Sequence, residues 1–207
     1  MEHIHPTKVA LLDTVIRLLE TKNLEEITSD EVLKLSGVSR GSMYHHFADF
    51  PDVVEQAQVR RFGQYIDESI ASLVEIAFSS PSREDLRAGL QRVTRASQDP
   101  SFSNRRFDRV MPYAAAAKNP RMLATLGREQ ERLTTAIADL AADAQNNGYF
   151  SKEFSPRVIA VMIQAYTMGK IVDDVTPNHV DCDEWNLLID ALLDRLFGVD
   201  GLDHTGK

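Results

Sequence analysis

The chain lacks the features that mark several large classes of protein. Its single cysteine, Cys182, excludes an intrachain disulfide and any zinc site built from cysteine pairs. No apolar run approaches the roughly 18 residues that a membrane-spanning helix needs. The first residues also lack the basic-then-apolar pattern of a signal peptide. We therefore expect a cytoplasmic protein with no membrane partner.

Motifs that carry catalysis are missing as well. The sequence has no glycine-rich phosphate loop, no Gly-x-Ser-x-Gly and no His-Glu-x-x-His, so we assign no catalytic residue, metal ligand or cofactor. The stretch from Asp173 to Glu184 is rich in oxygen donors but has no repeated ligand spacing. We interpret it as a solvated acidic loop, with a metal site as the alternative. His3 and His5 are interpreted as part of a disordered N-terminal arm rather than as ligands.

Positive charge is scarce. The formal net charge is −8, and within residues 1–50 five lysines and arginines stand against eight aspartates and glutamates. This balance disfavours nucleic-acid binding by bulk electrostatics. Any such binding would depend on a few well-placed cations, hydroxyls and helix N-termini.

Hydrophobic periodicity predicts an all-α protein. Leu12, Val15, Ile16 and Leu19 follow the spacing of an amphipathic helix that begins near Pro6 and ends at Asn23. Asp49 is a candidate N-cap for a long helix that continues to about residue 78. Prolines and glycines mark the limits of the helices predicted further along the chain, at 83–98, 103–117, 121–146, 156–174 and 183–198.

Residues 28–39 have the pattern of a helix followed by a tight turn. Thr28 is a candidate N-cap, and Glu31 follows at capping-box spacing. Gly37 can adopt the positive φ of a tight turn, Val38 can fill the core beneath it, and Ser39 can cap the next helix.

The next helix is short and combines small with polar side chains. Gly41 and Ser42 would let it approach DNA closely, Tyr44 and the two histidines after it can reach phosphates, and Phe47 can point inward. The pattern is typical of the recognition helix of a helix-turn-helix. An ordinary pair of helices joined by a short turn is the alternative.

The whole run resembles the tetracycline-repressor (TetR) family of transcription regulators over residues 8–54. The resemblance implies an all-helical homodimer with an N-terminal DNA-binding headpiece and a C-terminal domain that binds a small molecule. The matching residues are Thr28, Gly37, Val38, Ser39, Gly41, Tyr44, His46 and Phe47.

The resemblance also implies individual roles. Thr28, Tyr44 and His45 match positions that hold the DNA backbone. The positions nearest the bases match Ser39, Arg40, Gly41 and Ser42; of these, Arg40 could read guanine or contact a phosphate. The sequence departs from the family at Asp30, which replaces a frequent basic residue, and at Phe50, which replaces a common phosphate-binding lysine.

The last two long helices carry apolar residues on nearly all faces, which predicts burial against the protomer and against a partner. The resemblance likewise places the dimer interface there. The interface residues we predict are Trp185, Leu188, Leu192 and Leu196. For the helix at 158–172, a central position in a monomer is the alternative. A kink at Pro112 would leave room for an apolar effector pocket, and its predicted lining is Phe62, Phe107, Met111, Tyr113, Met162 and Tyr166.

We therefore predict two domains, a helix-turn-helix domain at 1–48 and an effector-binding and dimerisation domain at 49–207. The function expected is that of a ligand-responsive repressor that an unknown small organic effector releases from an inverted-repeat operator in double-stranded DNA. A helical ligand-binding protein or enzyme that does not bind DNA is the alternative.

Overall fold

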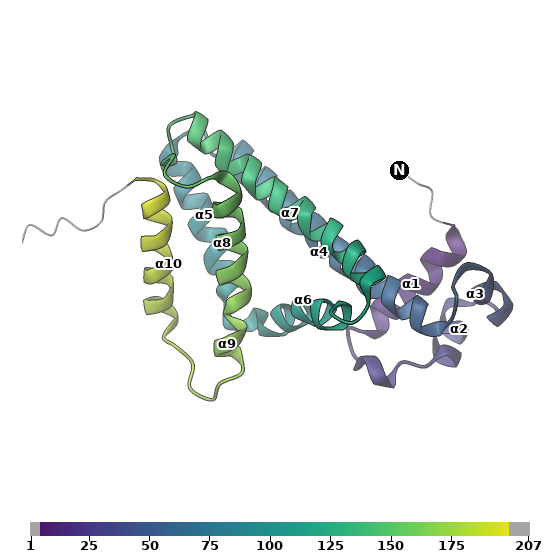
Figure 1. The fold of residues 1–207 in the computed structure, drawn as a ribbon. Helices are drawn as coiled ribbons and strands as arrows, with labels where there is room; N and C mark the ends of the chain where they lie inside the picture. Colours follow the sequence, from purple (N-terminus) through teal and green to yellow (C-terminus); the bar gives the residue numbers. More distant parts are fainter. Residues whose placement is uncertain (1–4, 199–207) are drawn as a thin grey trace, which may run out of the picture. The chain divides into compact units, whose positions relative to one another are not determined.

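The computed structural model describes residues 5–198, and within this range all regular structure is helical (Figure 1). This confirms the all-α prediction. Among the described helices, none combines the length and the hydrophobicity that a membrane-spanning helix requires. The α-helices are α1 (Pro6–Leu18), α2 (Ser29–Ser36), α3 (Arg40–His46), α4 (Phe50–Ser79), α5 (Arg83–Gln98), α6 (Ser103–Ala116), α7 (Pro120–Asn146), α8 (Pro156–Gly169), α9 (Ile171–Asp174) and α10 (Cys182–Leu196), with 3-10 turns η1 (Leu24–Glu26) and η2 (Pro100–Phe102).

The chain divides into two compact units. The first comprises Met1–Tyr65 with Pro112–Gly127, and the second comprises Ile66–Met111 with Arg128–Lys207. Helices α4, α6 and α7 each contribute residues to both units. The functional boundary predicted between residues 48 and 49 lies just before α4 and stays a prediction.

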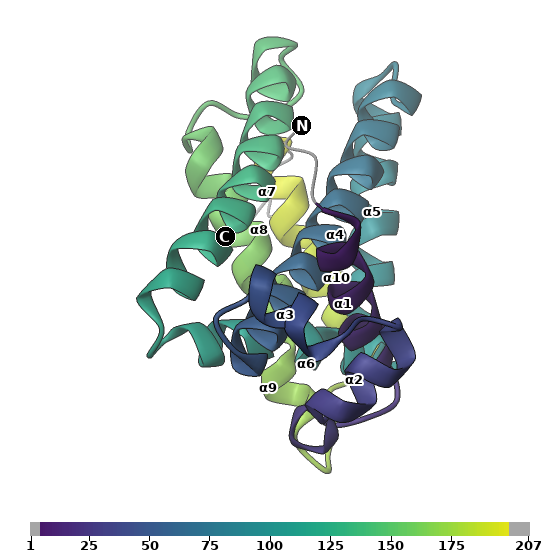
Figure 2. The same cartoon turned by 90° about the vertical axis from the view of Figure 1, so that its right-hand side faces the viewer.

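Helices α1, α2 and α3 form the N-terminal part of the first unit (Figure 2). α1 packs against both α2 and α3, because its apolar stripe supplies the centre of their common core. The buried residues of this core are Leu11, Leu12, Val15, Leu18, Ile27, Val32, Met43, Phe47, Val53 and Ala57.

The end of the first helix differs from the prediction. α1 ends at Leu18, five residues before Asn23. Asn23 has extended backbone (φ −69°, ψ 152°), so it is not a left-handed cap. Its backbone N–H donates a hydrogen bond to the Glu26 carboxylate at 2.8 Å, and the η1 turn begins directly after it. Asparagine at a helix end is compatible with either role, and the sequence alone did not separate them.

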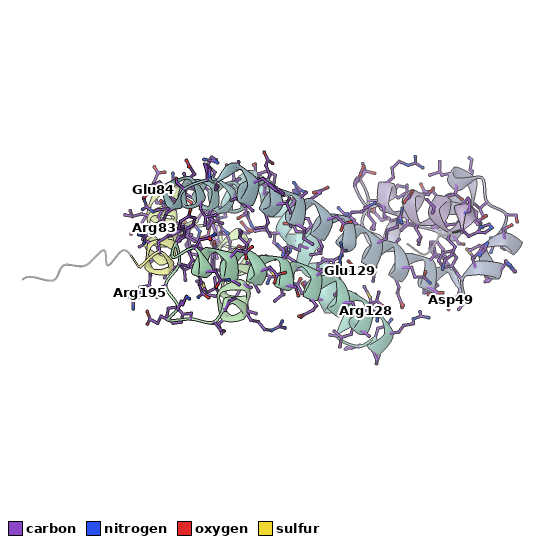
Figure 3. All side chains as sticks on the ribbon, turned by 90° about the horizontal axis from the view of Figure 1, so that it is seen from above. Asp49, Arg83, Glu84, Arg128, Glu129 and Arg195 are labelled. Atoms are coloured by element: carbon purple, nitrogen blue, oxygen red, sulfur yellow. The ribbon has the colours of Figure 1, made fainter. Side chains whose placement is uncertain are left out.

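The long fourth helix is confirmed. Asp49, labelled in Figure 3, accepts a hydrogen bond from the amide of Asp52 at 2.8 Å, as expected of an N-cap. Of the apolar stripe predicted at Phe62, Ile66, Ile70, Leu73 and Ala77, the side chains of Phe62 and Ile66 are buried. Ala77 is exposed, and its neighbour Ile76 is buried instead. One uninterrupted helix of 30 residues thus connects the two units along the chain.

In the second unit, α5 packs against α8 and α10. Its buried core is formed by Ile76, Leu86, Leu90, Ala141, Ala144, Phe150, Ile159, Ile189, Leu193, Leu196 and Phe197. Arg83, labelled in Figure 3 at the start of α5, donates to the carbonyl oxygen of Phe197 beyond the end of α10. A buried ion pair joins α6 to α9, with Arg106 Nε 2.5 Å from a carboxylate oxygen of Asp174.

Two details of this unit depart from the sequence prediction. The helix predicted at 156–174 consists of α8 and the short α9. α6 continues through Pro112 and is not interrupted there. A proline within a helix loses one backbone hydrogen bond, which need not end the helix.

Candidate nucleic-acid interface

The turn between α2 and α3 has the predicted geometry. Gly37 has φ +68°, in the left-handed region that glycine adopts without strain. A Cβ at this position would meet nothing within 4 Å, so the requirement for glycine is conformational rather than steric. Val38 is half-buried against the core of the first unit. The turn predicted from the sequence is confirmed.

Both predicted N-caps are confirmed as well. The Thr28 hydroxyl accepts a hydrogen bond from the amide of Glu31 at 3.4 Å, and the Ser39 hydroxyl accepts one from the amide of Ser42 at 3.1 Å. The hydroxyls of Ser39 and Ser42 also lie 2.8 Å apart. These bonds satisfy amides that would otherwise lack partners and fix where each helix begins.

Two side chains fix the orientation of α3. Met43 is 1% exposed and Phe47 is 3% exposed, and both belong to the core shared with α1. Phe47 was predicted to point inward, whereas the anchoring role of Met43 was missed. Met43 and Phe47 are four residues apart and therefore share one helix face.

The residues of α3 that were predicted to contact DNA are exposed or partly exposed. Arg40, Gly41 and His45 are exposed, Tyr44 is 54% exposed, and Ser42 is partly exposed. A Cβ added at Gly41 would meet only the Ser39 hydroxyl, at 4.0 Å. Internal packing therefore does not require this glycine, and the open backbone at Gly41 is available to an external partner.

Acidic residues of α2 hold two of the few cations of the headpiece. The guanidinium of Arg40 binds the carboxylate of Asp30 across the turn, and both side chains are exposed. Lys22 Nζ lies 2.6 Å from a carboxylate oxygen of Glu31. Arg40 must therefore exchange Asp30 for a phosphate or a base before it can contribute to DNA binding.

Three imidazoles gather where α3 ends beside the start of α1. The ring of His46 lies 4.5 Å from that of His5 and 5.0 Å from that of His45, measured between centroids. Partial burial, followed by the positive charges of His5, His45 and Lys8, lowers the pKa of His46.

His5 also caps α1, because its ring nitrogen accepts from the amide of Thr7 at 3.2 Å. The interpretation of His5 as part of a disordered arm was therefore wrong, and His3 lies outside the described residues. A histidine directly before a proline at a helix start was the available signal for a capping role.

Hydrogen bonds to the carboxylate of Asp52 stabilise the segment that follows α3. Its carboxylate accepts hydrogen bonds from the amide of Ala48 at 3.1 Å, from Gln56 at 2.9 Å and from Arg121 at 3.0 Å. Burial acts to raise the pKa of Asp52, but these hydrogen bonds and the nearby charges of Arg121 and Lys8 outweigh it and lower that pKa. The role of Asp52 was not predicted, and its bond with Arg121 joins residues 69 positions apart in the sequence.

The six residues predicted to line an effector pocket belong to both compact units. Phe62 and Tyr113 belong to the first unit and pack edge to face, with centroids 5.5 Å apart. The second unit holds the other four. Among them the Tyr166 hydroxyl lies 3.2 Å from that of Thr94, and burial raises the pKa of Tyr166. Phe107 and Met111 are exposed and Met162 is half-buried, and the pocket stays a prediction.

The predicted dimer residues on α10 divide into two groups. Leu188 and Leu192 are exposed and Trp185 is half-buried, whereas Leu196 is only 4% exposed. The segment after α7 covers the end of α10, where the amide of Ser151 donates to the carbonyl oxygen of Leu196 at 2.7 Å. Leu196 therefore belongs to the core of its own unit, and its assignment to an exposed dimer surface needs correction.

The two-sided apolar character of α8 and α10 is nevertheless clear. On α8, Ile159 is buried while Val158 and Val161 are exposed. On α10, Leu193 is buried while Leu187, which the sequence analysis did not select, is exposed. Both helices thus keep an apolar face that the described residues of one protomer leave exposed.

The acidic stretch before α10 is organised by its own hydrogen bonds. The Asp181 carboxylate accepts from the amides of Asp183 at 3.0 Å and Glu184 at 2.9 Å and so caps α10. Asp173 binds Lys170 and accepts from the amide of Val180 at 2.9 Å. Among residues 5–198, no group of three or more metal-ligating side chains is placed to hold an ion.

No protein-family model and no curated protein matches the chain. Solved structures do resemble it. A structure described as a putative TetR-family transcriptional regulator from Rhodococcus sp. is 19% identical in sequence and has a TM-score of 0.62. The alignment covers 93% of this chain and 100% of that one. A structure described as a putative TetR-family transcriptional regulator from Mesorhizobium loti is 15% identical and has a TM-score of 0.69, with 93% of this chain and 96% of that one covered. The fatty acid degradation regulator FadR from Bacillus halodurans is 15% identical and has a TM-score of 0.62, with 98% of this chain and 100% of that one covered. The chain has the fold of TetR-family regulators.

Proposed function

We propose that the protein is a dimeric, ligand-responsive DNA-binding regulator, and that it represses transcription until a small organic effector releases it from an inverted-repeat operator. The observation that carries the proposal is the construction of α3. Met43 and Phe47 anchor this helix in the core, while Arg40, Gly41 and Tyr44 are exposed. A recognition helix needs this combination of anchored and exposed residues.

The exposed residues fall into two roles. Ser39, Arg40, Gly41 and Ser42 stand at the N-terminal end of α3, the end that a helix-turn-helix directs at base edges. Tyr44, His45 and the N-cap Thr28 supply a hydroxyl, an imidazole and a helix N-terminus for phosphates. The phosphate contacts would set the position of the headpiece, and the base contacts would set the sequence it prefers.

The acidic residues of the headpiece weaken its non-specific affinity for DNA. Arg40 and Lys22 are already paired with carboxylates in the free protein, so binding must exchange one ion pair for another. Non-specific affinity for DNA is then weak, and it falls less steeply with salt than that of a basic DNA-binding protein, because few phosphates are neutralised. Discrimination between operator and other DNA would depend mainly on the close approach that Gly41 permits.

A homodimer explains the exposed apolar faces of α8 and α10. Val158 and Val161 on α8, with Leu187, Leu188 and Leu192 on α10, are exposed in one protomer and are suited to burial against a second copy. Two headpieces related by a two-fold axis would then read two half-sites of an inverted repeat.

The continuity of α4 supports control by an effector. The helix carries residues of both compact units, and no flexible linker interrupts it. An effector in the second unit can weaken DNA binding only if it binds the DNA-competent and DNA-incompetent arrangements unequally, with a coupling of about 1–3 kcal/mol. The apolar and aromatic residues predicted for the pocket favour a largely hydrophobic effector with one or two polar groups.

The direct test is titration of fluorescently labelled DNA from the regions that flank the protein's own gene, with binding followed by anisotropy. The informative variant is Gly41→Glu, which has room for its side chain in the free protein but places a carboxylate at the DNA-facing surface. Gly127→Glu is the matched control, because Gly127 is also an exposed helical glycine with no atom within 4 Å of an added Cβ.

We expect the Gly41→Glu protein to lose DNA binding, while the Gly127→Glu protein keeps wild-type affinity. Equal behaviour of the two variants would remove α3 from the interface. A wild-type protein that binds none of the flanking fragments would favour a helical ligand-binding protein without DNA-binding function.

A further inference from the structure

The first compact unit is larger than the helix-turn-helix domain predicted from the sequence. Besides Met1–Tyr65 it contains Pro112–Gly127, a segment that comprises the end of α6, the turn after it and the start of α7, and that we call the α6–α7 corner. Ala116, Met122 and Leu126 of this corner are buried. A segment from the second half of the chain therefore belongs to the same unit as α3.

Three residues, 47–49, connect α3 to α4, and each has a defined hydrogen bond. The amide of Phe47 donates to the carbonyl oxygen of Met43 at 2.9 Å, and Asp49 caps α4. Between them, the amide of Ala48 donates to Oδ2 of Asp52 at 3.1 Å. The carboxylate of Asp52 thus holds the chain where it leaves α3, and the conformation of this junction sets the direction of α3 relative to α4.

Arg121 of the α6–α7 corner binds the other oxygen of the same carboxylate. Its Nη2 lies 3.0 Å from Oδ1 of Asp52 and 3.0 Å from Oε2 of Glu55. Arg121 is the second residue of α7, where the helix dipole disfavours a cation. Its charge therefore does not stabilise its own helix, and its partners are two carboxylates of α4.

The burial of Asp52 makes this cation important. Asp52 is only 6% exposed, and a buried carboxylate is costly unless charges and hydrogen bonds compensate for the lost water. Arg121 and Lys8 both act on it electrostatically, but among the described residues Arg121 is the only cation hydrogen-bonded to it. Without Arg121, the carboxylate would keep two neutral donors and be drawn towards water, away from Ala48.

We propose that Arg121 is a positioning residue for DNA recognition, which holds the α3–α4 junction, and with it the orientation of α3, through the carboxylate of Asp52. The α6–α7 corner then belongs to the part of the protein that recognises DNA, although none of its residues is predicted to touch DNA. The effect on DNA rests on the proposed function, whereas the effect on the junction can be measured without DNA.

Amide hydrogen exchange, followed by NMR with labelled alanine and valine, measures the opening of the junction. The amide of Ala48 reports on the junction itself. The amide of Val32 reports on the unit as a whole, because Val32 is fully buried and its amide donates to the carbonyl oxygen of Thr28 at 3.1 Å.

Arg121→Met is the informative variant, and Arg132→Met is its matched control. Arg132 is also an exposed arginine of α7 that binds two carboxylates, those of Asp67 on α4 and Glu129, but it lies outside the first unit. The two variants lose the same charge, so a difference between them reflects the position of the arginine.

We expect Arg121→Met to speed the exchange of Ala48 about three- to fivefold, the range of a partly exposed ion pair, and to leave Val32 unchanged. Arg132→Met should change neither amide. Arg121→Lys keeps the cation and should stay near the wild type. Equal exchange of Ala48 in the two methionine variants would overturn the proposal. Equal acceleration of Ala48 and Val32 would also overturn it, because it would show a general loss of stability.

Two further variants test the route through Asp52. Asp52→Asn keeps an oxygen for the amide of Ala48 but removes the charge that Arg121 binds. In this background, Arg121→Met should have little further effect on Ala48. Glu55→Gln removes only the other pair and should leave Ala48 as in the wild type. An undiminished effect of Arg121→Met in the Asp52→Asn protein would overturn this route.

Anisotropy titrations measure the consequence for DNA, with the flanking fragment that the wild type binds most tightly and with a duplex of random sequence. Relative to Arg132→Met, Arg121→Met should raise the dissociation constant of the flanking fragment up to about fivefold, because binding must restore the orientation of α3. Affinity for the random duplex should not differ between the variants. An equal loss on both duplexes would overturn the role in orientation. If the wild type binds no DNA, the proposed function fails, and the exchange of Ala48 still decides whether Arg121 holds the junction.

Discussion

At the scale of single residues, the ion pair between Arg40 and Asp30 governs how the headpiece meets DNA. Both side chains are exposed, so their mutual attraction is screened by water and weak. The carboxylate of Asp30 nevertheless competes with DNA for the one long cation of α3. It also leaves a negative charge beside the surface that would face phosphates.

Replacing Asp30 with asparagine should therefore raise DNA affinity. An exposed pair is worth up to about 1 kcal/mol, which corresponds to about fivefold in the dissociation constant. Anisotropy titrations at one fixed salt concentration measure the change. Asp13→Asn is the matched control, because Asp13 is also exposed and paired, with Arg60 at 2.9 Å, but lies outside the helix-turn-helix. An equal gain in both variants would show only an effect of net charge.

The histidine cluster predicts a pH dependence of stability. The pKa of His46 is lowered in the folded protein from its ordinary 6.5, so the unfolded chain binds protons more readily than the folded one. The free energy of unfolding should then fall as the pH drops from about 7.5 to about 5.5, with the loss starting near the unfolded pKa.

Urea unfolding of the wild type and of His46→Gln across this range tests the prediction. His46→Gln should reduce the pH dependence of the free energy of unfolding relative to the wild type. If the free energy of unfolding of the His46→Gln protein varies with pH as steeply as that of the wild type, His46 does not contribute to this pH dependence.

At the scale of elements, the helix-turn-helix was largely predictable because its signals are local. Thr28, Gly37 and Ser39 act through hydrogen bonds and dihedral angles within a few residues of themselves, so their types and spacing predict the caps and the turn. Contacts between distant segments could not be predicted in this way. Examples are the packing of His5 against His46 and the hydrogen bond between Trp185 and Gln98.

The turn itself yields a paired prediction. Gly37→Ala places a Cβ at φ +68° and should lower the free energy of unfolding by about 1–2 kcal/mol. Gly41→Ala lies within α3, where no close contact opposes a Cβ, and should stabilise the protein by up to about 1 kcal/mol. Chemical denaturation measures both values. If both variants raised the free energy of unfolding, or both lowered it, this account of the turn would be contradicted.

At the scale of the whole molecule, sequence periodicity predicted the helices but not which faces they bury. α10 is apolar on most sides, so Leu192 and Leu196 looked equivalent, yet Leu192 is 41% exposed and Leu196 is covered by the segment after α7. The six predicted pocket residues likewise came from separate helices, and their grouping depends on tertiary packing that periodicity does not encode.

The exposed apolar face of α10 predicts a dimer that a single charge disrupts. Leu192→Glu would bury a carboxylate in an apolar interface, at a cost of several kcal/mol, so the dimer should dissociate. Leu123→Glu, at an exposed leucine of α7, is the control and should remain dimeric. Sedimentation velocity distinguishes the two states. A wild-type monomer at micromolar concentration would refute the proposed assembly.

The claim that two α3 helices read DNA together is tested most directly by selecting bound duplexes from a random pool with the wild-type protein. We expect an inverted repeat whose half-site centres lie about one helical turn, ~34–36 Å, or a multiple of it apart. Selection with Arg40→Ala should keep this symmetry but relax one base position in each half-site. Enrichment of sequences without two-fold symmetry, or no enrichment at all, would contradict the proposed dimeric readout.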